Sequence, residues 1–485
     1  MIQVEEVKKG IELKDYNLYP TLALPLRELL SEASFLTPKL STRKIWMVNS
    51  TSRGGGVAEM MPAIVNFLRQ LNIECDWVVA GSDNASFFSF TKKIHNLIHG
   101  EGSPEINREE KEVYESENKK NSLQFLPYLK ENDIVVIHDP QPLPMARFIK
   151  EKLNVKIIWR CHIGLDTHLE QTKCAWSFLH QYTNYIDKSV FSAAEYIPGY
   201  LSGRASIMHP TIDPLDHKNR DLPIHKIVGI LCNSNLVEEY HPVLTPAFTE
   251  TAKRLQPDGS FQSPLMPSES GLLYNTNIVQ VSRWDKLKGF EELMDGFIQL
   301  KTNQEKYAVN ERNLRQLQLM ELVLAGPDPD FVADDPEGKE ILNQLTSRYM
   351  KLHPALQKQI VLLKLPMSSR KHNELIVNCL QRVASIVIQN SLKEGFGLTV
   401  TEAMWKTKPV IGSSAGGIKL QIRDEMDGLI VHDPKDPIEI AITLNKALSQ
   451  PKDREVWSYN AQKRVIENFL IFVQIRKWLQ LFAET

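Results

Sequence analysis

The sequence has few cysteines and no long apolar run. Its 485 residues include five scattered cysteines (Cys75, Cys161, Cys174, Cys232 and Cys379), and no two of them form a Cys-x-x-Cys pair. We expect each to pack as a small apolar side chain in a reducing compartment. No stretch approaches the roughly 20 apolar residues that span a bilayer. The acidic start lacks the apolar core of a signal peptide, so a cytoplasmic protein is predicted.

The chain also carries almost no net charge. A formal charge of −2 gives no electrostatic reason to expect nucleic acid or a membrane surface as a partner. With 42% apolar and 24% charged residues, the composition is that of an ordinary globular protein. Because 485 residues exceed what one hydrophobic core usually organises, we expect two domains. The sequence does not fix the oligomeric state, and a homodimer remains open.

Strand-like and helix-like segments alternate along both halves of the chain. The first half begins with a strand at 44–49, a glycine loop and a helix at 57–71, and the second half repeats this order from residue 277. Such repeats are βαβ units with right-handed crossovers, so we predict an α/β fold of two Rossmann-like, doubly wound domains. Further strands are predicted at 76–80, 133–137, 155–159, 188–192, 205–208, 321–325, 359–365, 383–388, 409–412 and 428–431.

Proline and polar residues at 209–223 indicate an interdomain linker. The predicted domains are residues 1–220, which include an N-terminal extension, and residues 221–465. A C-terminal helix, 466–485, is expected to cross back to the first domain.

Four further segments have distinct patterns. In the extension, helical spacing near 22–30 is broken by prolines, and 101–121 is expected to be a solvated helix face. Residues 256–271, rich in Ser, Pro and Gly, are predicted to be a mobile loop. Residues 453–484 are predicted to form one long amphipathic helix.

The stretch Asn390–Trp405 follows the predicted buried strand at 383–388 and passes through a glycine turn into a helix. Glu394 lies in the turn, and Glu402 follows eight residues later. An unbroken helix would separate the two by roughly 12 Å, whereas a turn that bends back lets both flank the helix N-terminus. Backbone amides there, with Gly395 and Gly397, suit an anionic ligand. Phosphates at one end and hydroxyls at the other describe a nucleotide sugar.

Two other loops follow strands in the same way. Gly54, Gly55 and Gly56 could cradle a phosphate or form a simple tight turn, and Glu59 stands where the dinucleotide fingerprint would have its third glycine. In the loop Ser282–Gly289, Arg283 offers a planar fork for a phosphate and Lys288 a point charge. This loop lies at the carboxyl edge of a predicted sheet, and that position favours a ligand-binding role for it.

His162 and Asp139 also follow predicted strands. Each has a structural alternative: a lone histidine is often part of a core, and Asp139 could bind a hydroxyl or cap a turn. Cys161, His162 and His168 do not have metal-ligand spacing, so no metal site is predicted.

Several stretches together carry a family resemblance. The chain resembles the retaining GT-B glycosyltransferases of family 4 and, within them, most closely the trehalose glycosyltransferring synthases. Glu394 and Glu402 are typical of the broad glycosyltransferase family. The motifs Asn-Ser-Thr-Ser, His-Asp-Pro-Gln-Pro and Arg-Cys-His are more specific and favour the trehalose-forming enzymes. The matching residues are 49–52, 54–59, 138–142, 159–163, 212–215, 281–284, 334–338, 394–405, 408–412 and 416–418.

The resemblance implies a GT-B fold whose two domains face a central cleft, with residues 1–220 taking the acceptor and 221–465 the donor. It implies reversible transfer of glucose from a nucleoside diphosphate glucose (with UDP, ADP or GDP) to glucose, giving α,α-trehalose with retention. No further cofactor and no metal are expected.

The resemblance also assigns roles to individual residues. The diphosphate is held by Arg283 and Lys288 with Gly54–Gly56, the ribose by Glu402, and the donor glucose and phosphate by Glu394 with Gly395, Phe396, Gly397 and Leu398. His162 and Asp139 line the sugar side.

Two other functions stay open at this point. A retaining trehalose phosphorylase would use Arg283 and Lys288 to hold inorganic phosphate instead of a nucleotide. A sugar-nucleotide sensor would bind the same ligand without turnover.

Overall fold

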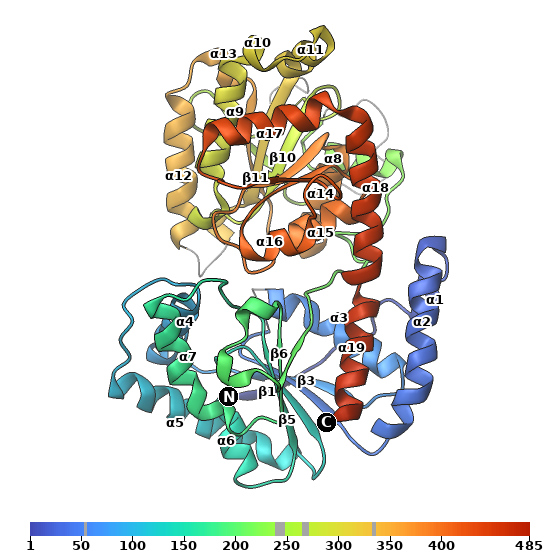
Figure 1. Cartoon of the computed structure of the whole chain (residues 1–485), viewed down its shortest axis with the longest axis vertical. Coiled ribbons are helices and arrows are strands. Elements are labelled where there is room, and N and C mark those ends of the chain that lie inside the picture. Colours follow the sequence, from blue (N-terminus) through green and yellow to red (C-terminus); the bar gives the residue numbers. More distant parts are fainter. Residues whose placement is uncertain (53–55, 238–247, 264–270, 332–335) are drawn as a thin grey trace. The chain divides into compact units, whose positions relative to one another are not determined.

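The computed structural model describes residues 1–52, 56–237, 248–263, 271–331 and 336–485 (Figure 1). The chain divides into two compact units: unit 1 holds residues 1–211 and 467–485, and unit 2 holds 212–466. Unit 1 thus ends nine residues before the predicted boundary at 220. The difference arises because the segment after Thr211 packs within unit 2, where the Asn219 carbonyl accepts a 3.1 Å hydrogen bond from Trp405 Nε1.

Unit 1 is built on a seven-stranded sheet in the order β1-β3-β2-β4-β5-β6-β7. All neighbours are parallel except β1, which pairs antiparallel with β3 and was not predicted. Each residue of β2 and β4 is buried, as expected for apolar runs covered on both faces. The strands are β1 (Ile2–Glu5), β2 (Ile45–Asn49), β3 (Cys75–Ala80), β4 (Ile134–His138), β5 (Lys156–Cys161), β6 (Lys188–Phe191) and β7 (Ala205–Ile207).

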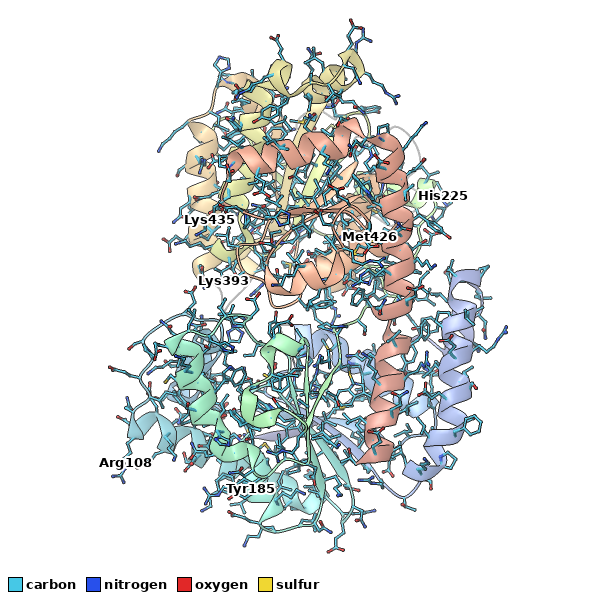
Figure 2. The ribbon with its side chains drawn as sticks, in the orientation of Figure 1. Arg108, Tyr185, His225, Lys393, Met426 and Lys435 are labelled. Atoms are coloured by element: carbon cyan, nitrogen blue, oxygen red, sulfur yellow. The ribbon has the colours of Figure 1, made fainter. Side chains whose placement is uncertain are left out.

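Helices of unit 1 cover this sheet (Figure 1). They are α1 (Leu13–Tyr16), α2 (Pro20–Leu36), α3 (Gly56–Gln70), α4 (Ala85–Ile98), α5 (Arg108–Phe125), α6 (Met145–Lys150), α7 (Glu170–Thr183) and α19 (Ile471–Glu484). Short 3-10 turns are η1 (Thr37–Leu40), η2 (Leu126–Tyr128), η3 (Ala194–Tyr196) and η4 (Gly199–Leu201). Figure 2 shows Arg108 pointing outward from the start of α5, which fits the predicted solvated face.

The N-terminal extension packs against the end of the chain. α2 runs unbroken through Pro25, so the predicted interruption was wrong; Pro20 occupies the first turn, where its missing N–H costs nothing. Beside it, Arg476 of α19 forms 2.6 Å ion pairs with Glu28 and Glu32. The C-terminal helix therefore belongs to the unit that the chain begins with.

Unit 2 has an eight-stranded sheet in the order β15-β14-β13-β10-β11-β12-β8-β9. At one edge of this sheet, β8 and β9 form an antiparallel hairpin whose turn is 256–260. The loop predicted at 256–271 is therefore wrong at 261–262, which form β9; residues 264–270 lie outside the described residues. The strands are β8 (Lys253–Leu255), β9 (Phe261–Gln262), β10 (Thr276–Val281), β11 (Met320–Pro327), β12 (Ile360–Leu365), β13 (Ile386–Gln389), β14 (Val410–Ser413) and β15 (Leu429–Val431).

Helices surround this second sheet as well. They are α8 (Ile224–Asn233), α9 (Phe290–Thr302), α10 (Gln304–Tyr307), α11 (Glu311–Leu319), α12 (Pro336–Met350), α13 (Pro354–Gln357), α14 (Arg370–Val383), α15 (Leu398–Trp405), α16 (Gly416–Gln421), α17 (Pro437–Ser449) and α18 (Pro451–Asn468), with 3-10 turns η6 (Lys286–Lys288) and η7 (Pro329–Phe331). Two doubly wound parallel sheets confirm the predicted fold class.

Two element boundaries were predicted wrongly in unit 2 and at the C-terminus. Val383 ends α14 rather than opening the strand, because apolar residues continue from the buried helix face into β13. The single helix predicted at 453–484 is two helices: Leu470 has extended backbone and is fully buried, so apolar spacing persists across the break. No helix in the described ranges is long and apolar enough to cross a membrane.

Replacement of Gly289 should disturb the packing of unit 2 directly. This glycine adopts φ 63°, and an added Cβ would lie 2.1 Å from the Asn390 carbonyl oxygen. Gly289→Ala should therefore lower the free energy of unfolding by about 1–3 kcal/mol through steric overlap and backbone strain. Urea denaturation would measure it. Gly199→Ala, where the new Cβ meets nothing within 4 Å, is the matched control; equal stability of the two variants would contradict the packing described here.

Candidate functional site

The predicted donor residues of unit 2 come from two loops at one edge of its sheet. β10 lies between β11 and β13, so chain connections leave it in opposite directions. In open α/β sheets, ligands bind outside the carboxyl ends of strands at such a switch point. The loops after β10 and β13 contact each other there, where the Leu392 amide donates a 2.8 Å hydrogen bond to the Leu287 carbonyl.

Gln280, fully buried near the end of β10, connects both loops. Its Oε1 accepts a 2.9 Å bond from the Asn390 amide, and its Nε2 donates a 2.8 Å bond to the Lys288 carbonyl. One side chain therefore fixes the backbone on either side of the switch point. Sequence reasoning missed Gln280, because its two partners lie in loops that only the folded sheet brings beside it.

Lys288 and Glu394 form an ion pair across these loops. Lys288 Nζ lies 2.6 Å from Glu394 Oε2, and only 15% and 13% of the two side chains are exposed. Ser391 Oγ donates a second bond of 3.1 Å to the same carboxylate oxygen. The structure thus brings together two predicted site residues that lie 106 positions apart in the sequence.

The glycine turn after Glu394 is closely packed on one side. Gly397, with φ 84°, is the N-cap of α15. A Cβ on Gly417 would lie 2.1 Å from Phe396 Cα, so α16 packs directly on the turn, whereas a Cβ on Gly395 would meet nothing within 4 Å. Gln421 donates hydrogen bonds to the carbonyls of Phe396 and Gly397. The turn that leads into Leu398 is therefore held rigidly while Gly395 has space beside it.

Within the described residues, Arg283 and Glu402 have ion-pair partners other than Lys288 and Glu394. Arg283 is 67% exposed, and its Nη2 lies 3.8 Å from Asp285 Oδ2. Glu402 occupies the second turn of α15 and is buried. Its Oε1 lies 3.7 Å from Lys218 Nζ, and its buried Oε2 has no hydrogen-bond partner.

A buried polar cluster beneath Glu402 was not predicted. Lys406, one helical turn further on, donates to Gln381 Oε1 at 2.7 Å, to the Glu402 carbonyl at 3.2 Å and to Asn219 Oδ1 at 3.3 Å. Burial lowers the pKa of Lys406 to about 7, and Glu402 partly opposes this shift. Burial raises the pKa of Asp216 to about 7, with contributions from Asp213 and Glu402. The spacing of four between Glu402 and Lys406 was the signal available in the sequence.

In unit 1, His162 pairs with a histidine that was not assigned a role. His138 Nδ1 lies 2.9 Å from His162 Nε2, and the rings stack at 5.2 Å. Asp139, with φ 62°, accepts a 2.8 Å bond from the His162 amide. Burial lowers the pKa of His138 to about 3 and that of His162 well below its usual value, and it raises the pKa of Asp139 to about 6. Both imidazoles are therefore neutral near pH 7.

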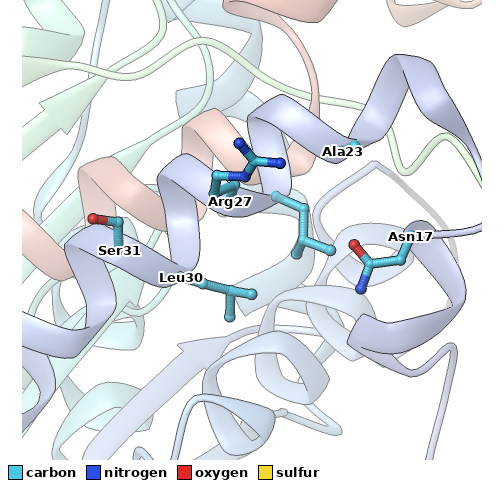
Figure 3. A pocket seen from close by; sticks show the side chains of 6 residues that line it. Asn17, Ala23, Arg27, Leu30 and Ser31 are labelled. Carbon is cyan, nitrogen blue, oxygen red and sulfur yellow. The ribbon is translucent and has the colours of Figure 1, made fainter.

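The glycine loop of unit 1 is only partly described. Gly54 and Gly55 lie outside the described residues, and Gly56 is the exposed first residue of α3. A hollow of about 480 Å³ elsewhere in unit 1 lies along α2 and contains none of the predicted site residues (Figure 3). Asn17, Ala23, Leu26, Arg27, Leu30 and Ser31 line it.

Comparisons with known proteins identify the family and the fold. Residues 47–198 match the family described as trehalose synthase, N-terminal domain, and residues 275–464 match glycosyl transferases group 1. The trehalose synthase of Pyrococcus horikoshii is 32% identical over 99% of this chain and 98% of its own length. The trehalose phosphorylase of Pleurotus sajor-caju is 26% identical over 80% of this chain, which spans 50% of that protein.

A solved E. coli structure, described as trehalose-6-phosphate bound with UDP-2-fluoro glucose, superposes with a TM-score of 0.65. It covers 91% of this chain and 99% of its own at 15% identity, so the likeness concerns the fold. Two doubly wound units, the second of which matches group 1 transferases, define a glycosyltransferase of the GT-B fold. The chain belongs to the trehalose synthase family, as the sequence resemblance predicted.

Burial of Lys406 should make stability depend on pH. Its folded-state pKa is about 7 against an ordinary value of 10.5, so between these values the unfolded chain binds a proton that the folded chain does not. The free energy of unfolding relative to Lys406→Met should therefore rise with pH, by up to about 1.4 kcal/mol per unit. Urea denaturation of both proteins at pH values from about 7 to 10 measures this.

The exposed Lys351 supplies the control, because Lys351→Met should keep the pH profile of the unsubstituted protein. Parallel pH profiles for Lys406→Met and the unsubstituted protein would show that Lys406 keeps an ordinary proton affinity.

Proposed function

We propose that the protein transfers glucose reversibly from a nucleoside diphosphate glucose to free glucose and forms α,α-trehalose with retention. The observation that carries this proposal is the Lys288–Glu394 ion pair at the switch point, beside the glycine turn into α15. Its place suits a ligand with both phosphate and sugar groups. The relatives named trehalose synthase support glucose as both sugars.

The donor would be held by residues of unit 2. Lys288 and the exposed Arg283 would stabilise the negative charge that grows on the departing diphosphate. The open side of Gly395 admits an anionic oxygen close to the backbone. Since Glu394 already neutralises Lys288, the pair can receive a sugar hydroxyl on the carboxylate and a phosphate oxygen on the ammonium. Because the diphosphate leaves readily, no glycosidase-type acid pair and no further cofactor are needed.

Glu402 would bind the ribose. Its Oε2 is buried without a hydrogen-bond partner, and a hydroxyl donor would satisfy it. Lys218 Nζ lies 3.7 Å from the other carboxylate oxygen, Oε1.

The acceptor glucose would bind unit 1 at His162. A neutral imidazole bonds sugar hydroxyls, and Asp139 fixes the backbone that carries it. In this proposal Asp139 orients His162.

Trehalose phosphorylase activity is the second candidate. It is favoured by the same cationic loop, since Arg283 and Lys288 could hold inorganic phosphate, and by similarity to trehalose phosphorylases. The buried, unpartnered Glu402 Oε2 favours the nucleotide, because a phosphorylase has no ribose to place there.

Substrate assays separate these activities. The protein incubated with glucose and UDP-, ADP- or GDP-glucose should release nucleotide and yield a non-reducing disaccharide. Trehalose with inorganic phosphate should yield no glucose 1-phosphate. Glucose 1-phosphate from the second mixture, with no product from the first, would identify a phosphorylase. Binding of the nucleotide sugar without turnover would identify a sensor.

Arg283 provides the mutational test. Arg283→Ala should lower kcat by ~10²-fold or more, because a charge that stabilises the leaving diphosphate is lost. As the side chain is exposed, the melting temperature should stay unchanged. Lys286→Ala removes an exposed cation from the same loop and should keep most activity. Full activity of a folded Arg283→Ala protein would remove Arg283 from the site.

A further inference from the structure

A second group of buried polar side chains lies in unit 1, between the sheet and α19. His138 and Arg160 are paired across the neighbouring strands β4 and β5, so their side chains project from the same face. From α19, Gln474 and Trp478 lie one turn apart on one helix face, and the rings of Trp478 and His138 are 6.4 Å apart. Thr211 Oγ1 donates a 2.8 Å hydrogen bond to Gln474 Oε1.

Five nitrogen atoms in this group are buried without a hydrogen-bond partner. They are Arg160 Nε and Nη1, His138 Nε2, Gln474 Nε2 and Trp478 Nε1. The four side chains are at most 2% exposed, so bulk water does not satisfy these atoms. Four of the five can only donate, and His138 Nε2 donates in one tautomer. The group is therefore a set of hydrogen-bond donors without an acceptor.

The group also has an excess of positive charge. Arg160 is fully buried, and its Nη2 bonds the neutral Met208 carbonyl at 2.6 Å and Ser192 Oγ at 3.3 Å. Within the described residues, no carboxylate lies within ion-pair distance of it. Asp139 acts on Arg160 electrostatically, but its carboxylate bonds the His162 amide.

Lys477 adds a second cation near this group. Within the described residues, its Nζ donates a hydrogen bond to the Ile207 carbonyl at 3.2 Å. Burial lowers the pKa of Lys477, and the charge of Arg160 lowers it further. A buried charge without a counter-charge is costly, so an anion is the ligand chemistry that would stabilise the group.

We propose that unit 1 binds a small monovalent anion of halide size among Arg160, His138, Gln474 and Trp478. A water molecule fits these partners poorly, because its own two protons would need acceptors, whereas a halide only accepts. With its Nε2–H directed to the anion, neutral His138 presents Nδ1 as an acceptor to His162 Nε2–H, 2.9 Å away. The bound anion thereby sets the tautomer of His162. This inference does not depend on the proposed transferase activity.

Thermal unfolding of the full-length protein tests the anion site directly. In sodium methanesulfonate, whose anion is too bulky for a halide site, added sodium chloride or bromide at constant ionic strength should raise the melting temperature by about 2–4 °C, with saturation. Crystals soaked in bromide should show an anomalous peak bonded to Arg160. A flat melting curve with water density at this position would overturn the proposal.

The Gln474→Glu variant places a fixed negative charge where the anion is proposed to bind. The glutamate keeps an acceptor for Thr211 and places a carboxylate oxygen where the unpartnered Nε2 lies. The variant should melt at least as high as the unsubstituted protein and lose its halide response. Gln318→Glu adds the same charge at an exposed position of α11 and should keep the response. A halide response that survives Gln474→Glu unchanged would place the anion elsewhere; if this variant fails to fold, the bromide peak decides.

Discussion

The arrangement of unit 2 depends on the ion pair between Lys288 and Glu394. Each side chain is largely buried, and either one alone would leave an uncompensated charge in the protein. The pair is possible only because the two loops approach closely, which Gly289 permits at Asn390 and Gly417 permits at Phe396. The glycines and Gln280 therefore hold the two loops together. As a result, the opposite charges of Lys288 and Glu394 stay paired at the switch point of the sheet.

The two carboxylates of the Glu-x7-Glu element have different surroundings. Glu394 forms an ion pair with Lys288 and accepts a hydrogen bond from Ser391 Oγ, so its charge is balanced. Glu402 lies inside α15, where Lys218 is more distant and one oxygen has no partner. An acid–base couple would need both groups to exchange protons with the same substrate atoms, whereas these environments suit two separate contacts. Lys406 and Asp216 below Glu402 further distinguish it, since their pKa values have moved from opposite sides to about 7.

Much of the fold followed from local patterns in the sequence. Runs such as Ile45–Asn49 and Thr276–Val281 are buried on both faces, so apolar continuity predicted parallel strands and their order placed loops at a common edge. The partner of Glu394 could not be predicted from spacing, because it depends on β13 lying next to β10. For the same reason β1 was missed: only its pairing with β3 makes Ile2–Glu5 a strand. Gln280, His138 and Lys406 were missed because buried polar residues acquire partners only in three dimensions.

The sequence left Asp139 and His162 each with a structural and a functional reading, and both functional readings stay predictions. Asp139 Oδ1 accepts a hydrogen bond from the His162 amide, which positions the backbone of His162. His162 keeps its imidazole paired with His138, and burial holds both rings neutral. A neutral ring can exchange hydrogen bonds with a hydroxyl but offers no charge to a phosphate. If the acceptor binds at His162 as proposed, an uncharged sugar would suit this ring better than a sugar phosphate, and this is the chemical distinction between making trehalose directly and making its phosphate ester.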